Sequence, residues 1–189
     1  MMKKKEDQDK VKVGVFTGRF QPVHLGHVDN LVTASLSVHQ MDILIYDLPL
    51  IFNNGPKRLS KKSNPFSYEE RHMMLHSALL EYGMREDQFR IDSLKNYVAK
   101  LLKRNPETGS AGSLAYHIER HGLATYALEV AFKAAGHEVH VIEDYKARRD
   151  PENSKIRAVD VRNLLRDRGD WEVKVPTSAR GIIRRHAFN

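Results

Sequence analysis

Short apolar runs alternate with amphipathic segments along most of this chain of 189 residues. The runs are β-prone or continuously apolar, whereas the segments between them repeat their apolar residues with a helical period. We expect strands over residues 11–16, 42–46, 89–91, 113–118 and 138–142, and helices over 26–38, 68–83, 97–103, 123–135 and 158–168 and after Pro176. This alternation predicts an α/β fold with a parallel sheet.

Composition narrows the class of protein. The ten N-terminal residues are mostly charged, so we expect a disordered leader over 1–10 and one domain over 11–189. No apolar run approaches the ~20 residues that cross a bilayer, so no membrane partner is expected. The chain has no cysteine, which excludes disulfides, Cys-based zinc sites and thiol catalysis. These features favour a cytoplasmic protein.

Positive charge is concentrated at the C-terminal end. Residues 155–189 hold nine Lys or Arg against four Asp or Glu, a net charge of +5. Such an end suits a polyphosphate or a nucleic acid, although most of these residues fit a solvated helix face. Nucleic acid is not the expected partner, because the sequence has no aromatic-rich platform and no helix-turn-helix pattern.

The most informative motif is the stretch from Gly18 to His27, which reads GRFQPVHLGH. It follows the first expected strand and precedes the first expected helix, where an α/β sheet has its ligand crevice. The N-terminus of that helix offers free N–H groups to a phosphate. His24 and His27 are three residues apart and can face one crevice, while Arg19 adds a fixed cation. Nucleotidyl transfer needs this kind of positioning and charge neutralisation.

The sequence leaves two other roles open for these histidines. They could be satisfied turn or core histidines, which is the common role of a single histidine. They could also bind a metal, but the only further ligand nearby is Asp29, so no protein-held metal is expected.

Three ordered blocks carry a resemblance to a known family. The first is Gly18–His27, the second is NPFSYEER over residues 64–71, and the third combines residues 160–162 with 169–171. Together they span residues 12 to about 186. The chain resembles the HxGH nucleotidyltransferase superfamily, and within it the archaeal-type nicotinamide-nucleotide adenylyltransferases.

The resemblance implies a Rossmann-like nucleotidyltransferase fold, with a five-stranded, mostly parallel sheet flanked by helices on both faces. It implies ATP with Mg²⁺ held mainly by the ATP phosphates, a small phosphorylated acceptor in nicotinamide mononucleotide, and NAD and pyrophosphate as products. It also implies a homo-oligomer, as is common in the family.

The resemblance also assigns site residues. His24, His27, Arg19 and Arg162 are the expected catalytic residues. The expected nucleotide-binding set is Thr17, Gly18, Arg19, Phe20, Gln21, His24, Gly26, His27 and Arg162.

Three residues are expected at the substrate: Tyr97, Asn64 and Lys57. Tyr97 falls where the family has a Trp that stacks on the nicotinamide ring, although a core Tyr on a helix fits equally well. Asn64 also fits a role in fixing the loop before the second helix, together with Arg71. Lys57 lies in a basic loop, residues 57–62, that could close over the triphosphate or simply be solvated.

The sequence departs from the family pattern in two places. Arg157 and Val159 stand where the C-terminal motif has hydroxyl residues that bind phosphate, and YHIE over residues 116–119 replaces a Ser-Gly-Asn stretch. Three alternatives therefore remain open: another phosphorylated acceptor such as phosphopantetheine, CTP as the nucleotide, or a non-catalytic nucleotide sensor.

Overall fold

A computed structural model describes residues 11–46, 64–103, 114–118, 122–134, 137–141 and 150–187. The expected leader over residues 1–10 and the basic loop over 57–62 lie outside these ranges, so the structure does not bear on them. The strands are β1 (Val11–Gly18), β2 (Gln40–Ile45), β3 (Phe89–Ser93), β4 (Leu114–Ile118) and β5 (Glu138–Val141).

The helices follow the predicted alternation closely. They are α1 (Leu25–Ser35), α2 (Tyr68–Glu81), α3 (Leu94–Lys103), α4 (Gly122–Ala134), α5 (Pro151–Ser154), α6 (Ala158–Arg166) and α7 (Thr177–Ala187), with 3-10 turns η2 (Glu86–Gln88) and η5 (Glu172–Lys174). The start of α2 is a capping box, with Ser67 as the N-cap and Glu70 three residues further on. Ser67 accepts a hydrogen bond from the Glu70 N–H, and the Glu70 carboxylate accepts one from the Ser67 N–H. Such a cap stabilises a helix by about 1 kcal/mol.

The five strands form one sheet in the order β3-β2-β1-β4-β5, and neighbouring strands run parallel to each other. The chain moves outward from β1 through β2 to β3 and then returns to the other side of β1 with β4. The carboxyl end of β1 therefore lies at the switch point of the strand order, where open parallel sheets bind ligands. The predicted α/β architecture with a parallel sheet is confirmed.

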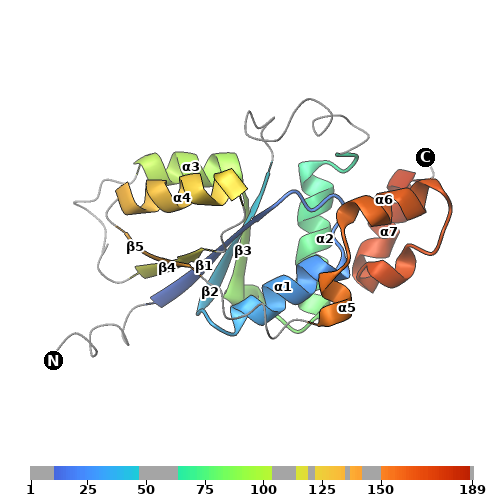
Figure 1. The fold of residues 1–189 in the computed structure, drawn as a ribbon, viewed down its shortest axis with the longest axis horizontal. Coiled ribbons are helices and arrows are strands. Elements are labelled where there is room, and N and C mark those ends of the chain that lie inside the picture. The colour runs from blue at the N-terminus through green and yellow to red at the C-terminus, as the bar shows by residue number, and fades with distance from the viewer. Residues whose placement is uncertain are drawn as a thin grey trace.

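Helices cover both faces of the sheet, as Figure 1 shows. Alternate residues of β1 face opposite sides, because the side-chain period of a strand is two. Val13 and Val15 pack with Leu94 of α3 and with Leu128 and Phe132 of α4. On the other face, β1 and β2 supply the core residues Phe16, Met41, Ile43 and Ile45, to which the helices add Val28, Leu31, Met74, Leu75, Leu79, Val161 and Ile183.

The C-terminal helices α5, α6 and α7 sit beside α1 and α2, at one end of the molecule (Figure 1). Glu81 in the last turn of α2 accepts hydrogen bonds from the backbone N–H groups of Thr177 and Ser178 at 3.1 and 2.8 Å. The carboxylate therefore neutralises the positive N-terminal end of α7 and ties it to α2. No helix within the described ranges is both long and apolar enough to cross a bilayer.

Helix α5 lies between the expected strand over 138–142 and the expected helix over 158–168, where the sequence predicts no element. Asp150 is the N-cap, and its carboxylate accepts hydrogen bonds from the N–H groups of Glu152 and Asn153 at 2.7 and 3.2 Å. Pro151 occupies the first helical position, where its missing N–H has no cost. Asp150 and Pro151 therefore begin a short helix.

Candidate functional site

The candidate site is the turn between β1 and α1. His24 is the N-cap of α1, and its extended backbone lets its carbonyl accept the N–H groups of His27 and Val28 at 2.9 and 3.2 Å. The His24 and His27 rings stack with 3.6 Å between centroids and 27° between planes. The predicted pair of imidazoles is therefore gathered at the N-terminus of the first helix.

Phe20 shapes this turn. Its φ of +51° is in the left-handed region, which a non-glycine residue seldom occupies without support from its surroundings. Its buried ring makes an edge contact with His27, with 4.9 Å between centroids. A Cβ on Gly18 would lie 2.7 Å from the Phe20 ring. Gly18 thus makes room for that ring.

Arg162 of α6 reaches across to this turn. Its Nη1 donates a hydrogen bond to the carbonyl of Gln21. Burial lowers the pKa of Arg162, and the nearby positive charge of Arg19 lowers it further. Two guanidinium groups that the sequence separates by more than a hundred residues therefore lie close enough to repel each other. A bound polyanion relieves such repulsion.

Gln21 joins the first motif to the second. Its Nε2 donates to the Phe66 carbonyl at 2.8 Å, and its Oε1 accepts from the Phe66 N–H at 3.0 Å. The side chain is buried, with 3% of its surface exposed. Asn64, two residues before Phe66, is partly buried at the same junction.

Arg71 connects the turn to β2 and α2 through hydrogen bonds to backbone carbonyls. Its Nη1 donates to the carbonyls of Arg19 and Tyr46 at 2.9 and 2.8 Å, and its Nε donates to the Ser67 carbonyl at 3.0 Å. This buried guanidinium thus links the ends of β1, β2 and the start of α2. The expected role of Arg71 in fixing the loop and helix start agrees with these contacts.

Gly26 is a point of close packing between helices. A Cβ there would lie 2.5 Å from the backbone oxygen of Asn153 in α5. Asp29, one turn further along α1, accepts from the Asp150 N–H at 3.2 Å through Oδ2. Glycine at this position lets α5 approach α1, which brings the following helix α6 and its Arg162 to the site.

Thr17 and Tyr46 stand at the carboxyl ends of neighbouring strands. Their hydroxyls hydrogen-bond at 2.9 Å. Burial raises the pKa of Tyr46, and the Thr17 hydrogen bond and the charge of Arg19 oppose that rise. Tyr46 was not predicted as a site residue. A polar residue at the end of a buried strand could have indicated it, because parallel sheets bind ligands at the carboxyl ends of their strands.

Tyr97 lies on the face of the sheet that α3 and α4 cover, opposite the face that packs against α1. Its hydroxyl donates to Asp42 Oδ2 at 2.8 Å, and its ring packs with the cluster around Phe132. Asp42 pairs with Val15 in the middle of β1, before the strand end that carries the histidines. The structure therefore places Tyr97 among core residues and does not bring it together with His24 and His27. Lys57 lies outside the described residues.

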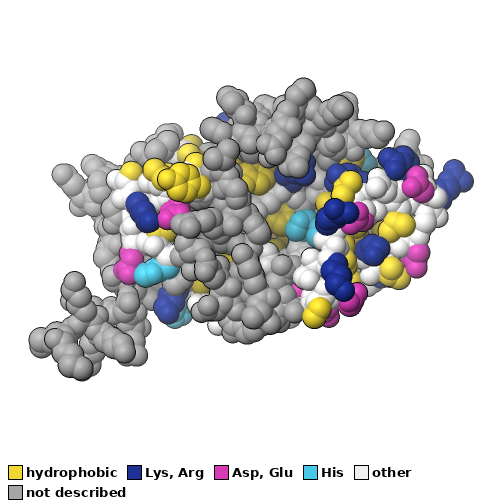
Figure 2. All heavy atoms as spheres, viewed as in Figure 1, with side chains coloured by type: hydrophobic (Ala, Val, Ile, Leu, Met, Phe, Trp, Pro, Cys, Tyr) yellow, Lys and Arg dark blue, Asp and Glu magenta, His cyan; other side chains and the backbone are white. Residues whose placement is uncertain are grey.

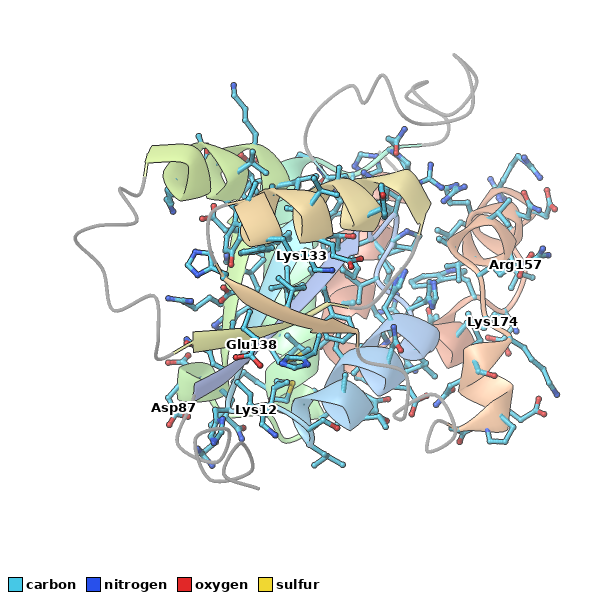
Figure 3. All side chains as sticks on the ribbon, turned by 60° about the vertical axis from the view of Figure 1, so that its left-hand side comes forward. Lys12, Asp87, Lys133, Glu138, Arg157 and Lys174 are labelled. Carbon is cyan, nitrogen blue, oxygen red and sulfur yellow. The ribbon has the colours of Figure 1, made fainter. Side chains whose placement is uncertain are left out.

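The start of α6 carries the departure from the family motif. Arg157 is the N-cap, and its guanidinium donates to the Asp160 carboxylate at 3.1 and 3.0 Å. This pair raises the pKa of Arg157 and lowers that of Asp160. Figure 3 shows Arg157 on the C-terminal helices, at the opposite end of the molecule from Lys12 and Asp87. Val159 is exposed.

Basic side chains lie on the surface of the C-terminal helices. Figure 2 shows Lys and Arg over the C-terminal helices, with a histidine beside them. The described ranges contain no group of three His, Cys, Asp or Glu residues arranged to hold a metal ion. The basic side chains make this part of the surface suited to binding an anion.

The parallel α/β sheet carries a His-x-Gly-His turn at the N-terminus of its first helix, the combination that the sequence resemblance associates with the HxGH nucleotidyltransferases. Residues 15–107 match the family model described as cytidylyltransferase-like. The sequence-based assignment to the HxGH nucleotidyltransferases is thereby confirmed.

Two relatives are similar to this chain in sequence. A nicotinamide-nucleotide adenylyltransferase of Thermococcus kodakarensis is 28% identical over 184 residues, covering 92% of this chain and 83% of that protein. A phosphonoformate cytidylyltransferase of Streptomyces viridochromogenes is 33% identical over 82 residues, covering 41% of this chain and 45% of that protein.

A solved structure shares the fold. It is a bifunctional NMN adenylyltransferase/ADP ribose pyrophosphatase from Francisella tularensis, with a TM-score of 0.57 at 20% identity. The match covers 94% of this chain and 52% of that one. The chain thus spans about half the length of this enzyme and of the Streptomyces relative.

Proposed function

We propose that this chain is a nicotinamide-nucleotide adenylyltransferase, which transfers AMP from ATP to nicotinamide mononucleotide. The observation that carries the proposal is the gathering of His24, His27, Arg19 and Arg162 at the N-terminus of α1. Four cationic or N–H-donating side chains and a helix N-terminus form a site for a polyphosphate. The Thermococcus relative, matched over 92% of this chain, supports the choice of acceptor.

The reaction is a single displacement. A phosphate oxygen of nicotinamide mononucleotide attacks the α-phosphorus of ATP, the bond from that phosphorus to the bridging oxygen of the β-phosphate breaks, and pyrophosphate leaves. No covalent enzyme intermediate is needed. The protein contributes by placing donors where negative charge spreads in the transition state.

Each side chain has a place in this proposal. The imidazole N–H groups of His24 and His27 bind phosphate oxygens of ATP, as do the N–H groups at the start of α1. Arg19 and Arg162 neutralise the leaving pyrophosphate. Mg²⁺ bound to ATP would neutralise part of the triphosphate charge.

A cytidylyltransferase is the second candidate. The family description and the Streptomyces relative favour CTP as the nucleotide.

The loss of hydroxyls at Arg157 and Val159 favours a third candidate, a sensor that binds nucleotide without turnover. The Arg157–Asp160 ion pair speaks against it, because it keeps the N-terminus of that helix polar. The homo-oligomer and the single domain over residues 11–189 stay predictions.

A matrix of nucleotides and acceptors tests the proposal. Pyrophosphate release is measured from ATP and CTP, each with nicotinamide mononucleotide, phosphopantetheine and phosphonoformate. We expect turnover with ATP and nicotinamide mononucleotide, and NAD as the product by mass spectrometry. Turnover with CTP alone would assign the second candidate, and binding of ATP with no turnover in any combination would assign the sensor.

A further inference from the structure

Gln21 stands between three parts of the site. Its side-chain amide makes two hydrogen bonds, and both go to the backbone of Phe66. Its backbone carbonyl accepts from Arg162 Nη1. Gln21 therefore belongs to the first motif, its side-chain amide bonds to Phe66 in the second, and its carbonyl accepts a hydrogen bond from Arg162 in the third.

We propose that Gln21 is a positioning residue that sets the guanidinium of Arg162 at the phosphate site and does not itself bind the nucleotide. This inference rests on the proposed function, since it assigns Arg162 to phosphate. It departs from the sequence prediction, in which Gln21 is a nucleotide-binding residue.

The geometry of the amide supports this reading. A Gln side chain has two donor hydrogens and one acceptor oxygen, and the pair with Phe66 uses the oxygen and one hydrogen. The group is buried, with 3% exposure, so it faces the protein and not a ligand in solution. The orientation of Gln21 fixes the direction of its carbonyl, which is the acceptor for Arg162.

Repulsion from Arg19 explains why the guanidinium of Arg162 needs a hydrogen-bond acceptor to stay in place. Arg19 lies close enough to Arg162 to disfavour its charge. Without an acceptor, the partly buried Arg162 side chain would turn away from that repulsion toward solvent. The Gln21 carbonyl opposes this movement, because a hydrogen bond to a charged donor is stronger than one between neutral groups.

Phe66 in turn contacts the last helix, α7. Its buried ring lies 4.7 Å from the ring of His186 in α7, and the Nδ1 of His186 lies 3.3 Å from Glu70 Oε1. Phe66 is therefore held by packing from α7 as well as by its own backbone bonds. Gln21 is thus fixed to a rigid part of the molecule.

The test is a double-mutant cycle on the binding of inorganic tripolyphosphate, measured by calorimetry. It combines Gln21→Ala with Arg162→Ala. Tripolyphosphate contains no base or acceptor, so the readout does not depend on which substrate is correct. We expect Gln21→Ala to weaken binding about tenfold, and to weaken it less than about twofold further when Arg162 is already Ala.

Two other variants control for folding. Phe89→Leu alters a buried residue at the start of β3, away from the site, and should lower the Tm without changing tripolyphosphate affinity. Gln21→Glu preserves the side-chain size and the acceptor for the Phe66 N–H but loses the donor. It should fold and still weaken binding, which covers the case in which Gln21→Ala is unstable.

The outcomes are distinct. Additive losses from Gln21→Ala and Arg162→Ala would show that Gln21 acts independently of Arg162 and would overturn the inference, as would unchanged affinity in both Gln21 variants. A wild-type protein that does not bind tripolyphosphate overturns the inference together with the phosphate site. Wild-type binding and the expected coupling, without NAD synthesis, refute only the proposed acceptor.

Discussion

His24 and His27 stack their imidazole rings with 3.6 Å between centroids, although they belong to the N-cap and the first turn of one helix. A spacing of three residues places both on one side of α1. The turn that precedes them keeps them there, because the ring of Phe20 contacts His27 and the Gln21 side chain is bonded to Phe66. The pair is therefore a rigid feature of the strand-to-helix connection.

The packing role of Gly26 predicts a loss of stability on Gly26→Ala. The new methyl group would lie 2.5 Å from the Asn153 oxygen, so α5 must move. Overpacking of this kind costs about 1–3 kcal/mol. The matched control is Gly181→Ala in α7, where the nearest atom is the end of Arg185 at 4.0 Å.

Urea denaturation measures both changes. Gly181→Ala should raise the free energy of unfolding by up to about 1 kcal/mol, because alanine favours a helix more than glycine does. Equal effects from the two substitutions would contradict the proposed contact between α1 and α5.

The position of Tyr97 predicts different effects on stability and on catalysis. Tyr97→Phe removes the hydroxyl that bonds to the buried Asp42 and should lower the free energy of unfolding by about 1–3 kcal/mol. Tyr97→Leu also removes the aromatic ring and should leave the KM for the acceptor unchanged. A large rise in that KM for Tyr97→Leu alone would support the stacking role that the resemblance implies.

The hydrogen bonds of Glu81 to the start of α7 predict that the contact between α2 and α7 depends on pH. Burial pushes its pKa up, but the hydrogen bonds from Ser178 and Thr177 outweigh this and leave the pKa below its usual value of 4.5. A carboxylate with a lowered folded pKa stabilises the native state above its unfolded pKa, and this contribution is lost as pH falls through the folded pKa.

Replacement of Glu81 by Gln tests this link. Because the side chain is exposed, the loss at pH 7 should be only about 0.5 kcal/mol. The difference in Tm between the two proteins should shrink as the pH is lowered from 6 toward 3. A difference that stays constant over this range would show that the charge of Glu81 does not matter.

Much of the fold was predictable from local patterns. The period of apolar residues locates the strands and helices, since a strand repeats every two residues and a helix every 3.6. The capping box at Ser67 was visible because its two partners are three residues apart. Helix α5 was missed because Asp150 and Pro151 begin a short helix as readily as they interrupt a chain.

Contacts between distant segments were not predictable in the same way. The motif assigned Gln21 and Gly18 to the nucleotide, but their neighbours are Phe66 and the ring of Phe20, which only the folded chain reveals. The approach of Arg162 to Arg19 depends on how α5 and α6 pack on α1. The sequence located the chemistry of the site but not the bonds that hold it in place.

The central claim is that the stacked imidazoles bind the triphosphate of a nucleotide during adenylyl transfer. The most direct measurement is the rate of pyrophosphate release from ATP and nicotinamide mononucleotide in wild type, His24→Ala and His27→Ala, with the Tm recorded for each. We predict that each variant folds and that its kcat falls by about 10²–10³-fold, the usual loss when a transition-state donor is removed. Folded variants that retain the wild-type kcat would contradict the account.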